Sequence, residues 1–477
     1  MTSEVKVNSS SNYARNPSDL RGDDWLIGYS CSEFHQIYQS RVQKLAEFIQ
    51  TQGVSPRVLL AEPEPTAFLA SFLAAVWTKS PVFLANPNWV KAEREQVLKL
   101  TQPDIIFGKV AEYNLSYIHT NHVSIPNRSI LIPTGGSSGN LRFVIHTWET
   151  LTASVQGFQE YFNLKQINSF CTLPLYHVSG LMQFMRSFTT GGKLAIFPFK
   201  AVEKAELISF DPSDFFISLV PTQLQRLLNS TQTTHWLSKF KTVLLGGAPA
   251  WLDLLQQARL HQIRLAPTYG MTETAAQIAT LKPEDFLAGN NSYGQVLPHA
   301  KIRICREDHQ ELGVNQSGII RIEANSLALG YYSFTNNKFI DKEPSQRRTL
   351  NSDDVGYLDE QGYLTILGRN SSKIITGGEN VYPTEVEAAI YSTGLVMDVA
   401  VIGLVDADWG QVVTAVYVPS FPDILISTLQ TALQDKISKF KQPKYWVAVE
   451  SLPRNAQGKL NFKQLEKLAE NMIGEVG

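Results

Sequence analysis

The sequence predicts an α/β protein: a large N-terminal body of parallel or mixed sheets with helices plus a β-rich segment, followed by a small α+β C-terminal domain. Short apolar runs alternate with stretches of helical periodicity through the first part of the chain, the order expected of parallel strands joined by crossover helices. From about residue 294 to 367 the apolar runs shorten and alternate between Gly, Asp and Asn residues, which is typical of antiparallel strands. A smaller unit begins after Arg369, so we expect one domain over residues 1–369 and another over 370–477.

Each element follows from its local pattern. Residues 33–52 have apolar positions at helical spacing, and the apolar stretch at 66–77 predicts a second helix. Prolines end the apolar runs RVLLA and PVFLAN, which indicates strands. Residues 169–177 are expected to be a strand that leads into a loop, 191–198 a strand, and 241–249 a strand with a Gly-rich exit. Residues 214–222 should lead into a helix at 223–230. The antiparallel strands are expected at 301–307, 317–324 and 362–369, and the C-terminal domain should contain helices at 383–392 and 429–440 and strands at 396–406 and 412–420.

Composition excludes several classes of protein. The chain has 477 residues, 43% hydrophobic and 18% charged, with a net charge of -2, which fits a globular protein and gives no sign of a nucleic-acid partner. Its three cysteines are far apart and form no CxxC pair, the pattern of a reduced, cytoplasmic protein. The N-terminus lacks the apolar core of a signal peptide, and the longest apolar stretch is too short to span a bilayer, so we expect no integral membrane segment.

The most informative short segment is ILIPTGGSSGNLRFV, residues 130–144. Its glycines let the backbone turn tightly and approach a ligand, while hydroxyls and one cation supply hydrogen-bond donors and charge, as in a phosphate-binding loop. The residues concerned are Thr134, Gly135, Gly136, Ser137, Ser138, Gly139 and Arg142. The segment has neither the Walker A spacing nor the G-x-G-x-x-G spacing. Taken alone, it is equally well interpreted as an ordinary Gly/Ser hairpin turn.

A second segment, APTYGMTETAAQIAT, places polar residues at the exit of a predicted strand, where ligands bind in α/β sheets. Tyr269 can stack on a base, and Gly270 and Met271 bring the backbone close. Thr272 can donate to a phosphate oxygen, and Glu273 can hold a magnesium ion.

Two later segments add charged groups. NSDDVGYLDEQGYLTILGR, residues 351–369, offers Asp354 for ribose hydroxyls, with Arg369 nearby. LPRNAQGKLNFKQL places Lys459 directly after Gly458, on a flexible turn.

Together these segments resemble the acyl-adenylate-forming superfamily of acyl-CoA synthetases, peptide-synthetase adenylation domains and luciferases, over about residues 57–465. The first motif of that family reads T-S-G-T-T-G-x-P-K-G, and TGGSSGNLRF matches it with Leu141, Arg142 and Phe143 in place of proline, lysine and the last glycine. YGMTE matches fully and PRNAQGK matches well, while the T-G-D motif becomes Ser-Asp-Asp and keeps its last residue, Asp354. Four motifs in the family's order make the resemblance specific.

A narrower resemblance comes from LPLYHVSGL, LLGGAPA, YGMTETAAQ and TGGENVYPTEVE, which look like the 2-succinylbenzoate–CoA ligases of menaquinone and phylloquinone synthesis. In that group His177 and Ser179 would line the acyl pocket. Gly246 and Gly247 would form its wall and leave room for an aromatic acid.

The resemblance implies a reaction in two halves with ATP, Mg²⁺ and CoA. A carboxylate first attacks the α-phosphorus of ATP and expels pyrophosphate, with Arg142, Glu273 and Lys459 as the catalytic residues and Glu273 as the metal ligand. The thiolate of CoA then displaces AMP. Between the halves the small domain is mobile and rotates about a hinge at Ser371, where the family usually has Asp or Lys.

Each candidate also has an ordinary structural interpretation. His177 can be a hydrogen-bonded loop histidine, Gly246 and Gly247 a plain strand exit, and Arg369 half of a surface ion pair. An isolated lysine such as Lys459 usually lies on the surface without further function.

Three functions follow from the sequence. The first is a 2-succinylbenzoate–CoA ligase, and the second keeps the chemistry with another acid, as an aryl- or acyl-CoA ligase or a carrier-loading enzyme. The third is an ATP-binding regulator that has lost catalysis. The departures at Arg142, Ser352-Asp353 and Ser371 favour it, whereas the retention of Glu273, Asp354, Arg369 and Lys459 argues against it. The expected partners are a small carboxylic acid, ATP and CoA. The sequence indicates no interface, so it does not distinguish a monomer from a homo-oligomer.

Overall fold

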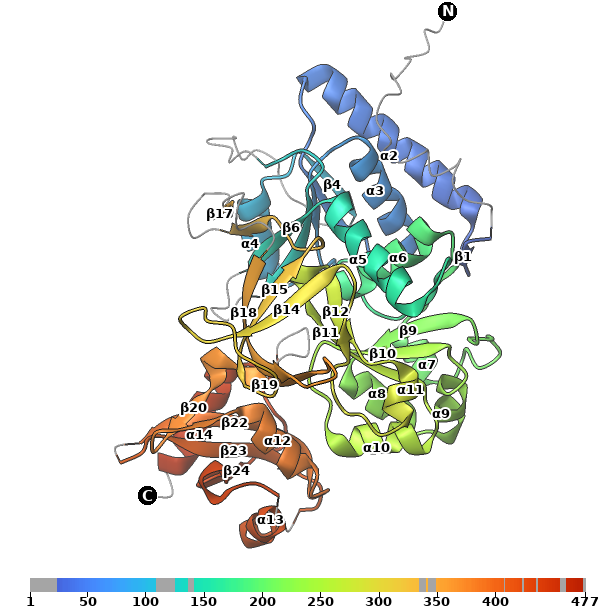
Figure 1. The fold of residues 1–477 in the computed structure, drawn as a ribbon. Helices are drawn as coiled ribbons and strands as arrows, with labels where there is room; N and C mark the ends of the chain where they lie inside the picture. The colour runs from blue at the N-terminus through green and yellow to red at the C-terminus, as the bar shows by residue number, and fades with distance from the viewer. Residues whose placement is uncertain are drawn as a thin grey trace, which may run out of the picture. The chain divides into compact units, whose positions relative to one another are not determined.

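The computed structural model describes residues 24–108, 125–135, 141–333, 340–341, 349–406, 408–422, 424–434, 436–454 and 460–474. The chain divides into two compact units (Figure 1). The first unit comprises Met1–Ser218, Gly270–Gln277 and Asn325–Arg348, and the second comprises Leu219–Tyr269, Ile278–Ala324 and Thr349–Gly477. The predicted domain boundary between residues 369 and 370 lies inside the second unit and stays a prediction. Among the helices of the described ranges, none has the length and apolar character needed to cross a membrane.

The first unit contains a seven-stranded sheet with the order β17-β16-β6-β5-β3-β2-β4. Strands β2 to β5 pair in parallel, as the alternation of strands and helices predicts, whereas β6 runs antiparallel to β5 and β16 antiparallel to β6. The strands are β2 (Val58–Ala61), β3 (Val82–Leu84), β4 (Ile105–Gly108), β5 (Ile130–Gly135), β6 (Leu141–His146), β16 (Gly330–Ser333) and β17 (Ile340–Asp341).

A second group of parallel strands in this unit has the order β1-β8-β7-β9. These strands are β1 (Leu26–Ile27), β7 (Asn168–Cys171), β8 (Leu194–Ile196) and β9 (Phe215–Leu219). The helices are α2 (Cys31–Gln52), α3 (Pro65–Trp77), α4 (Lys91–Thr101), α5 (Trp148–Phe162), α6 (Val178–Thr190) and α7 (Phe199–Glu203). The helices expected at 33–52 and 66–77 are thus confirmed as α2 and α3, which pack against each other (Figure 1).

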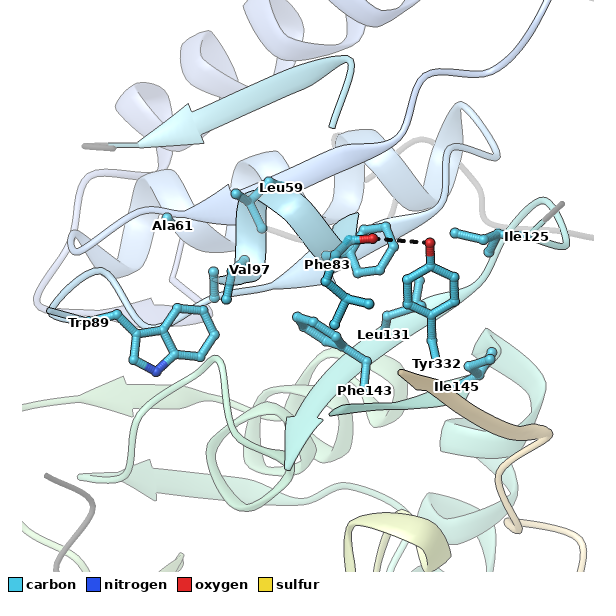
Figure 2. Close-up of a cluster of buried hydrophobic side chains, with 12 residues drawn as sticks. Leu59, Ala61, Phe83, Trp89, Val97, Ile125, Leu131, Phe143, Ile145 and Tyr332 are labelled. Carbon is cyan, nitrogen blue, oxygen red and sulfur yellow. Dashed lines mark hydrogen bonds between the residues drawn. The ribbon is translucent and has the colours of Figure 1, made fainter. Parts of the chain in front are cut away.

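A buried apolar cluster holds the seven-stranded sheet together (Figure 2). Phe83 and Phe143 meet edge to face with ring centroids 5.1 Å apart, a favoured aromatic geometry. Tyr332 packs in the same cluster, and its hydroxyl donates to the carbonyl oxygen of Leu100 at 3.2 Å. The cluster therefore contains one side chain from β6, Phe143, and one from the neighbouring β16, Tyr332, and it holds these two strands together.

The second unit contains parallel strands β10 (Thr242–Leu245) and β11 (Leu265–Met271) and the antiparallel pair β12 (Ala276–Thr280) and β13 (Gln295–Val296). The β-rich segment is confirmed as a four-stranded antiparallel sheet, β14-β15-β18-β19. Its strands are β14 (Ala300–Cys305), β15 (Gly318–Ala324), β18 (Thr349–Leu358) and β19 (Leu364–Arg369). The helices are α8 (Pro221–Leu228), α9 (Thr231–Leu237), α10 (Leu252–Leu260) and α11 (Pro283–Leu287).

The C-terminal part of this unit has the predicted α+β composition. Its sheet has the order β21-β20-β23-β22, with β24 parallel to β23, and helix α12 packs on β22 (Figure 1). The strands are β20 (Ile374–Thr376), β21 (Glu379–Val381), β22 (Val396–Asp406), β23 (Gly410–Pro419) and β24 (Tyr445–Ala448), and the helices are α12 (Pro383–Tyr391), α13 (Ile426–Leu433) and α14 (Phe462–Gly474). The helix predicted at 429–440 is wrong in extent: α13 ends at Leu433, and a 3₁₀ turn follows at Lys439–Lys441.

Glu387 lies on α12 and is partly buried in this C-terminal part. Its Oε1 accepts the N–H of Val401 at 2.9 Å, and burial raises the pKa of its carboxyl from 4.5 to about 7, with the charge of Asp398 adding to the rise. The folded state therefore retains a proton that the unfolded chain releases above pH 4.5. The stability that this proton contributes is fully present below that pH and is lost as the pH rises through about 7.

We expect Glu387→Gln to stabilise the protein at pH 8 by about 2 kcal/mol and to have little effect at pH 5, because glutamine keeps the acceptor and removes the charge. The measurement is the difference in melting temperature between variant and wild type at both pH values. Glu379→Gln, the same change at an exposed position, is the control. If Glu387→Gln changes the melting temperature by the same amount at pH 5 and at pH 8, the prediction is contradicted.

Candidate functional site

The predicted phosphate loop connects two antiparallel strands. Thr134 and Gly135 end β5, and Arg142 lies at the start of β6, where it pairs with Thr134. The hairpin of the alternative interpretation is therefore present, and it does not conflict with phosphate binding. The loop residues between the strands lie outside the described residues, and they include Gly136, Ser137, Ser138 and Gly139.

Glu273 lies on a tight turn at the exit of β11. The turn contains the 3₁₀ segment Thr272–Thr274, followed by Ala275 and Ala276 with φ of 53° and 77°. Positive φ costs about 1–3 kcal/mol at residues with a side chain, and such residues cluster at functional sites. Gly270 is required here, because a Cβ at this position would come within 2.0 Å of the carbonyl oxygen of Ala276.

A buried histidine, His146, is hydrogen-bonded to the backbone of this turn. His146 is fully buried, its Nε2–H donates to the carbonyl oxygen of Thr272 at 2.7 Å, and its Nδ1 lies 2.9 Å from the hydroxyl of Thr150. Burial lowers the pKa of His146 to about 4, so the ring is neutral near pH 7. His146 thus positions the backbone of Thr272, and sequence reasoning missed it because its partner is remote in the sequence.

Glu273 and Arg142, two of the predicted site residues, lie close together in the first unit. Nη2 of Arg142 lies 3.6 Å from Oε1 of Glu273, and the two side chains are 38% and 14% exposed. Tyr331, which sequence reasoning also missed, donates its hydroxyl to the same Oε1 at 2.7 Å. Burial and the nearby carboxylate raise the pKa of Tyr331, so its hydroxyl stays protonated and remains a donor.

Tyr269 and Asp354 meet in the second unit. The Tyr269 hydroxyl donates to Oδ2 of Asp354 at 2.7 Å, and the ring is 8% exposed at the end of β11. Burial raises the pKa of the Asp354 carboxyl, although Tyr269 and Arg369 partly offset that rise. Arg369 lies 3.5 Å from Oδ1 of Asp354 but is 70% exposed, and such pairs contribute at most about 1 kcal/mol. Arg369 is therefore free to turn toward a ligand.

The predicted hinge residue is bonded to β18. Ser371 donates its backbone N–H to Oδ1 of Asp353 at 3.0 Å and its hydroxyl to Oδ2 of the same carboxylate. Any rotation of the backbone at Ser371 would have to exchange these bonds for bonds to water. Its assignment as a hinge stays a prediction.

The four predicted acyl-pocket residues have clear local environments. His177 is the N-cap residue of α6 and is half-buried against the ring of Tyr176, while Ser179 is exposed in the first turn of that helix. In the second unit, a Cβ on Gly246 would lie 2.6 Å from Oγ1 of Thr268, and Gly247 has φ of +83°. Glycine at position 246 thus leaves room for the side chain of Thr268, and glycine at position 247 fits the positive φ, while contact with an acid stays a prediction.

Lys459 lies outside the described residues, but the chain on both sides of it is described. Arg454 and Leu460 form an antiparallel bridge, and the N–H of Asn461 donates to the carbonyl oxygen of Pro453 at 2.9 Å. Arg454 also donates to Oδ2 of Asp398 at 2.7 Å, which fastens this bridge to β22. The described residues that flank the lysine in the sequence are therefore bonded to each other.

Among the described residues, no group of three or more His, Cys, Asp or Glu side chains could hold a metal ion. Magnesium in phosphate-binding sites takes only one or two carboxylates and completes its shell with water and phosphate oxygens. The single carboxylate of Glu273, with one oxygen bound by Tyr331, fits an ion that is delivered together with a phosphate ligand.

Comparison with known proteins shows which family the chain belongs to. Residues 123–332 match the AMP-binding enzyme family and residues 385–459 match the AMP-binding enzyme C-terminal domain. The 2-succinylbenzoate–CoA ligase of Oceanobacillus iheyensis is 36% identical over 338 residues, which are 70% of this chain and 68% of that protein. Two structures of Bacillus subtilis o-succinylbenzoate CoA synthetase (MenE) are 25% identical in sequence. The complex with the acyl-adenylate intermediate OSB-AMP has a TM-score of 0.79 over 93% of this chain and 94% of that one. The complex with ATP and magnesium ion has a TM-score of 0.78 over 95% and 98%. The chain therefore belongs to the acyl-adenylate-forming, AMP-binding enzyme family and is similar to its 2-succinylbenzoate–CoA ligases.

Proposed function

We propose that this protein is an AMP-forming 2-succinylbenzoate–CoA ligase of menaquinone or phylloquinone synthesis, which uses ATP, Mg²⁺ and CoA. The turn formed by residues 269–273 carries the proposal. Its first residue, Tyr269, is hydrogen-bonded to Asp354, and its last, Glu273, contacts Arg142. Within the second unit, Tyr269 thus holds the carboxylate assigned to the ribose, and within the first unit the carboxylate assigned to the metal ion lies beside Arg142.

In the first half-reaction, a carboxylate oxygen of the acid attacks the α-phosphorus of ATP, and the bond to the β-phosphate breaks with pyrophosphate as the leaving group. Catalysis of such a step is mainly positioning and neutralisation of charge. Arg142 and the loop of residues 134–139 would bind the β- and γ-phosphates, and Lys459 would stabilise charge at the α-phosphate. Magnesium, held by Glu273, supplies charge neutralisation between the two anions.

In the second half-reaction, the thiolate of CoA attacks the acyl carbon and AMP leaves with the phosphate oxygen. The small domain would rotate at Ser371 before this step, a common form of gating. His177, Ser179, Gly246 and Gly247 would contact the acid. A cytoplasmic location and these contacts stay predictions.

We expect Asp354→Asn to raise the KM for ATP about tenfold or more, because a carboxylate accepts both ribose hydroxyls and charge-assisted hydrogen bonds contribute about 1.5–3 kcal/mol. The KM for the acid should change little. The measurement is initial rates with ATP and with 2′,3′-dideoxyATP. Wild type should lose affinity for the dideoxy nucleotide, whereas the variant should treat both nucleotides alike. A variant that still discriminates like wild type would contradict the assignment.

The proposed function is tested by pyrophosphate release from purified protein with ATP and Mg²⁺ across a panel of acids, with and without CoA. Release only with 2-succinylbenzoate, together with AMP and an acyl-CoA product when CoA is present, is the expected result. Release with benzoates or fatty acids instead would keep the chemistry and change the acid. ATP binding without release for any acid would overturn the proposal in favour of a regulator.

A further inference from the structure

Two adjacent tyrosines on β16 point to opposite faces of the sheet. Tyr332 pairs with Phe143 and lies in the buried cluster of Figure 2. Tyr331 pairs with Val144, so its side chain lies on the other face, the face of Arg142. Arg142 is the diagonal neighbour of Tyr331 across the two strands, a position that a long side chain and an aromatic ring can bridge.

The Tyr331 side chain contacts both charged groups of this half of the site. Its hydroxyl donates to Oε1 of Glu273 at 2.7 Å, and the guanidinium carbon of Arg142 lies 4.3 Å from the centre of its ring. The backbone supports the same geometry, because the N–H of Ala328 donates to the carbonyl oxygen of Glu273 at 2.9 Å. Two hydrogen bonds thus connect Glu273 to this part of the chain. Its backbone carbonyl bonds Ala328, just before β16, and its carboxylate bonds Tyr331 on β16.

This arrangement suits arginine better than lysine. A planar guanidinium can lie flat on a ring and still direct its N–H groups sideways, whereas an ammonium group is a point charge on a flexible stem. Nε of Arg142 is buried and has no hydrogen-bond partner among the described residues, so ring contact takes the place of hydrogen bonding there. Arg142 is also one of the three positions at which this segment departs from the family motif.

We propose that Tyr331 is a positioning residue with two separable functions. Its hydroxyl holds one oxygen of Glu273 and leaves the other, Oε2, directed to the metal ion. Its ring holds the guanidinium of Arg142 beside the phosphate loop. The inference rests on the proposed function, in which Glu273 binds magnesium and Arg142 binds phosphate, and it adds the residue that orients both.

The test uses binding, with Mn²⁺ as the probe ion and α,β-methylene ATP as a nucleotide that cannot be adenylated. Mn²⁺ affinity is read by electron paramagnetic resonance in the presence of the nucleotide, and nucleotide affinity by calorimetry. Tyr331→Phe keeps the ring and loses the hydroxyl, so Mn²⁺ should bind about 10-fold more weakly with nucleotide affinity at saturating metal unchanged. Tyr331→Leu loses both groups and should also weaken nucleotide binding, by about 5-fold.

Tyr332→Phe is the matched control, because it removes a hydroxyl from the next residue on the buried face. It should lower the melting temperature and leave Mn²⁺ affinity unchanged. Wild-type Mn²⁺ affinity in Tyr331→Phe, or an equal loss in Tyr332→Phe, would overturn the assignment of the hydroxyl. Equal nucleotide affinity in Tyr331→Phe and Tyr331→Leu would overturn the function assigned to the ring. A wild type that binds both probes but adenylates no acid would overturn only the proposed function, and one that binds neither probe would overturn both.

Discussion

Replacing Lys459 with alanine should slow formation of the acyl-adenylate by about 10²–10³-fold, the usual cost of removing one group that stabilises charge in a transition state. Thioester formation from a prepared acyl-adenylate should proceed at nearly the wild-type rate, because the lysine is assigned only to the first half-reaction. The measurement is acid-dependent exchange of pyrophosphate into ATP, beside consumption of the prepared adenylate with CoA.

Lys463→Ala is the control for this experiment. It removes the same charge from an exposed position on α14 and should leave both half-reactions unchanged. If Lys459→Ala forms the adenylate as fast as wild type, the assigned function of the lysine is wrong. If the rates of both half-reactions fall equally, the substitution disturbs the fold of the small domain, and the loss cannot be assigned to the charge of the lysine.

Glu273→Gln should lower the rate of adenylation by about 10²-fold at ordinary Mg²⁺ concentrations, because a neutral amide is a poor ligand for a hard cation. The glutamine can still accept the hydrogen bond of Tyr331, so the local fold should survive. The rate should be measured as a function of Mg²⁺ concentration, and we expect half-saturation to move to much higher concentration.

The matched control is Glu284→Gln on α11, which removes a carboxylate that pairs with Arg264 at 2.6 Å on the surface. That variant should keep the wild-type dependence on Mg²⁺. If the rate of Glu273→Gln depends on Mg²⁺ concentration as in wild type, the assignment of Glu273 as the metal ligand is wrong. The assignment of Asp354 to the ribose would not be affected.

Much of the fold could be predicted because its elements are encoded locally. The helices α2 and α3 begin and end where apolar periodicity and prolines indicate, and the β-rich segment forms the antiparallel sheet that its alternating runs predict. The exception is α13, which ends at Leu433 although the apolar spacing continues to residue 440. A 3₁₀ turn at Lys439–Lys441 follows, and Lys441 there pairs with Glu385 on α12.

The candidate site was predictable only in part. Glycine and hydroxyl residues mark the phosphate loop, and Glu273, Asp354 and Lys459 stand out by their motifs. His146 and Tyr331 belong to none of the motifs, and a histidine or tyrosine in a strand is found buried or exposed alike. Their partners lie 126 and 58 residues away in the sequence, and no local pattern indicates such pairs.

The sequence by itself determined the fold class, the family and the order of the charged groups, since these depend on local periodicity and on short motifs. Only the tertiary structure decided which of those groups meet. The register of β16 on β6 places Tyr331 with Arg142 on one face and Tyr332 with Phe143 on the other. A shift of one residue would exchange the faces, because successive side chains of a strand point in opposite directions. That register is held by the buried cluster, so packing in the core orients the two charges of the proposed phosphate site.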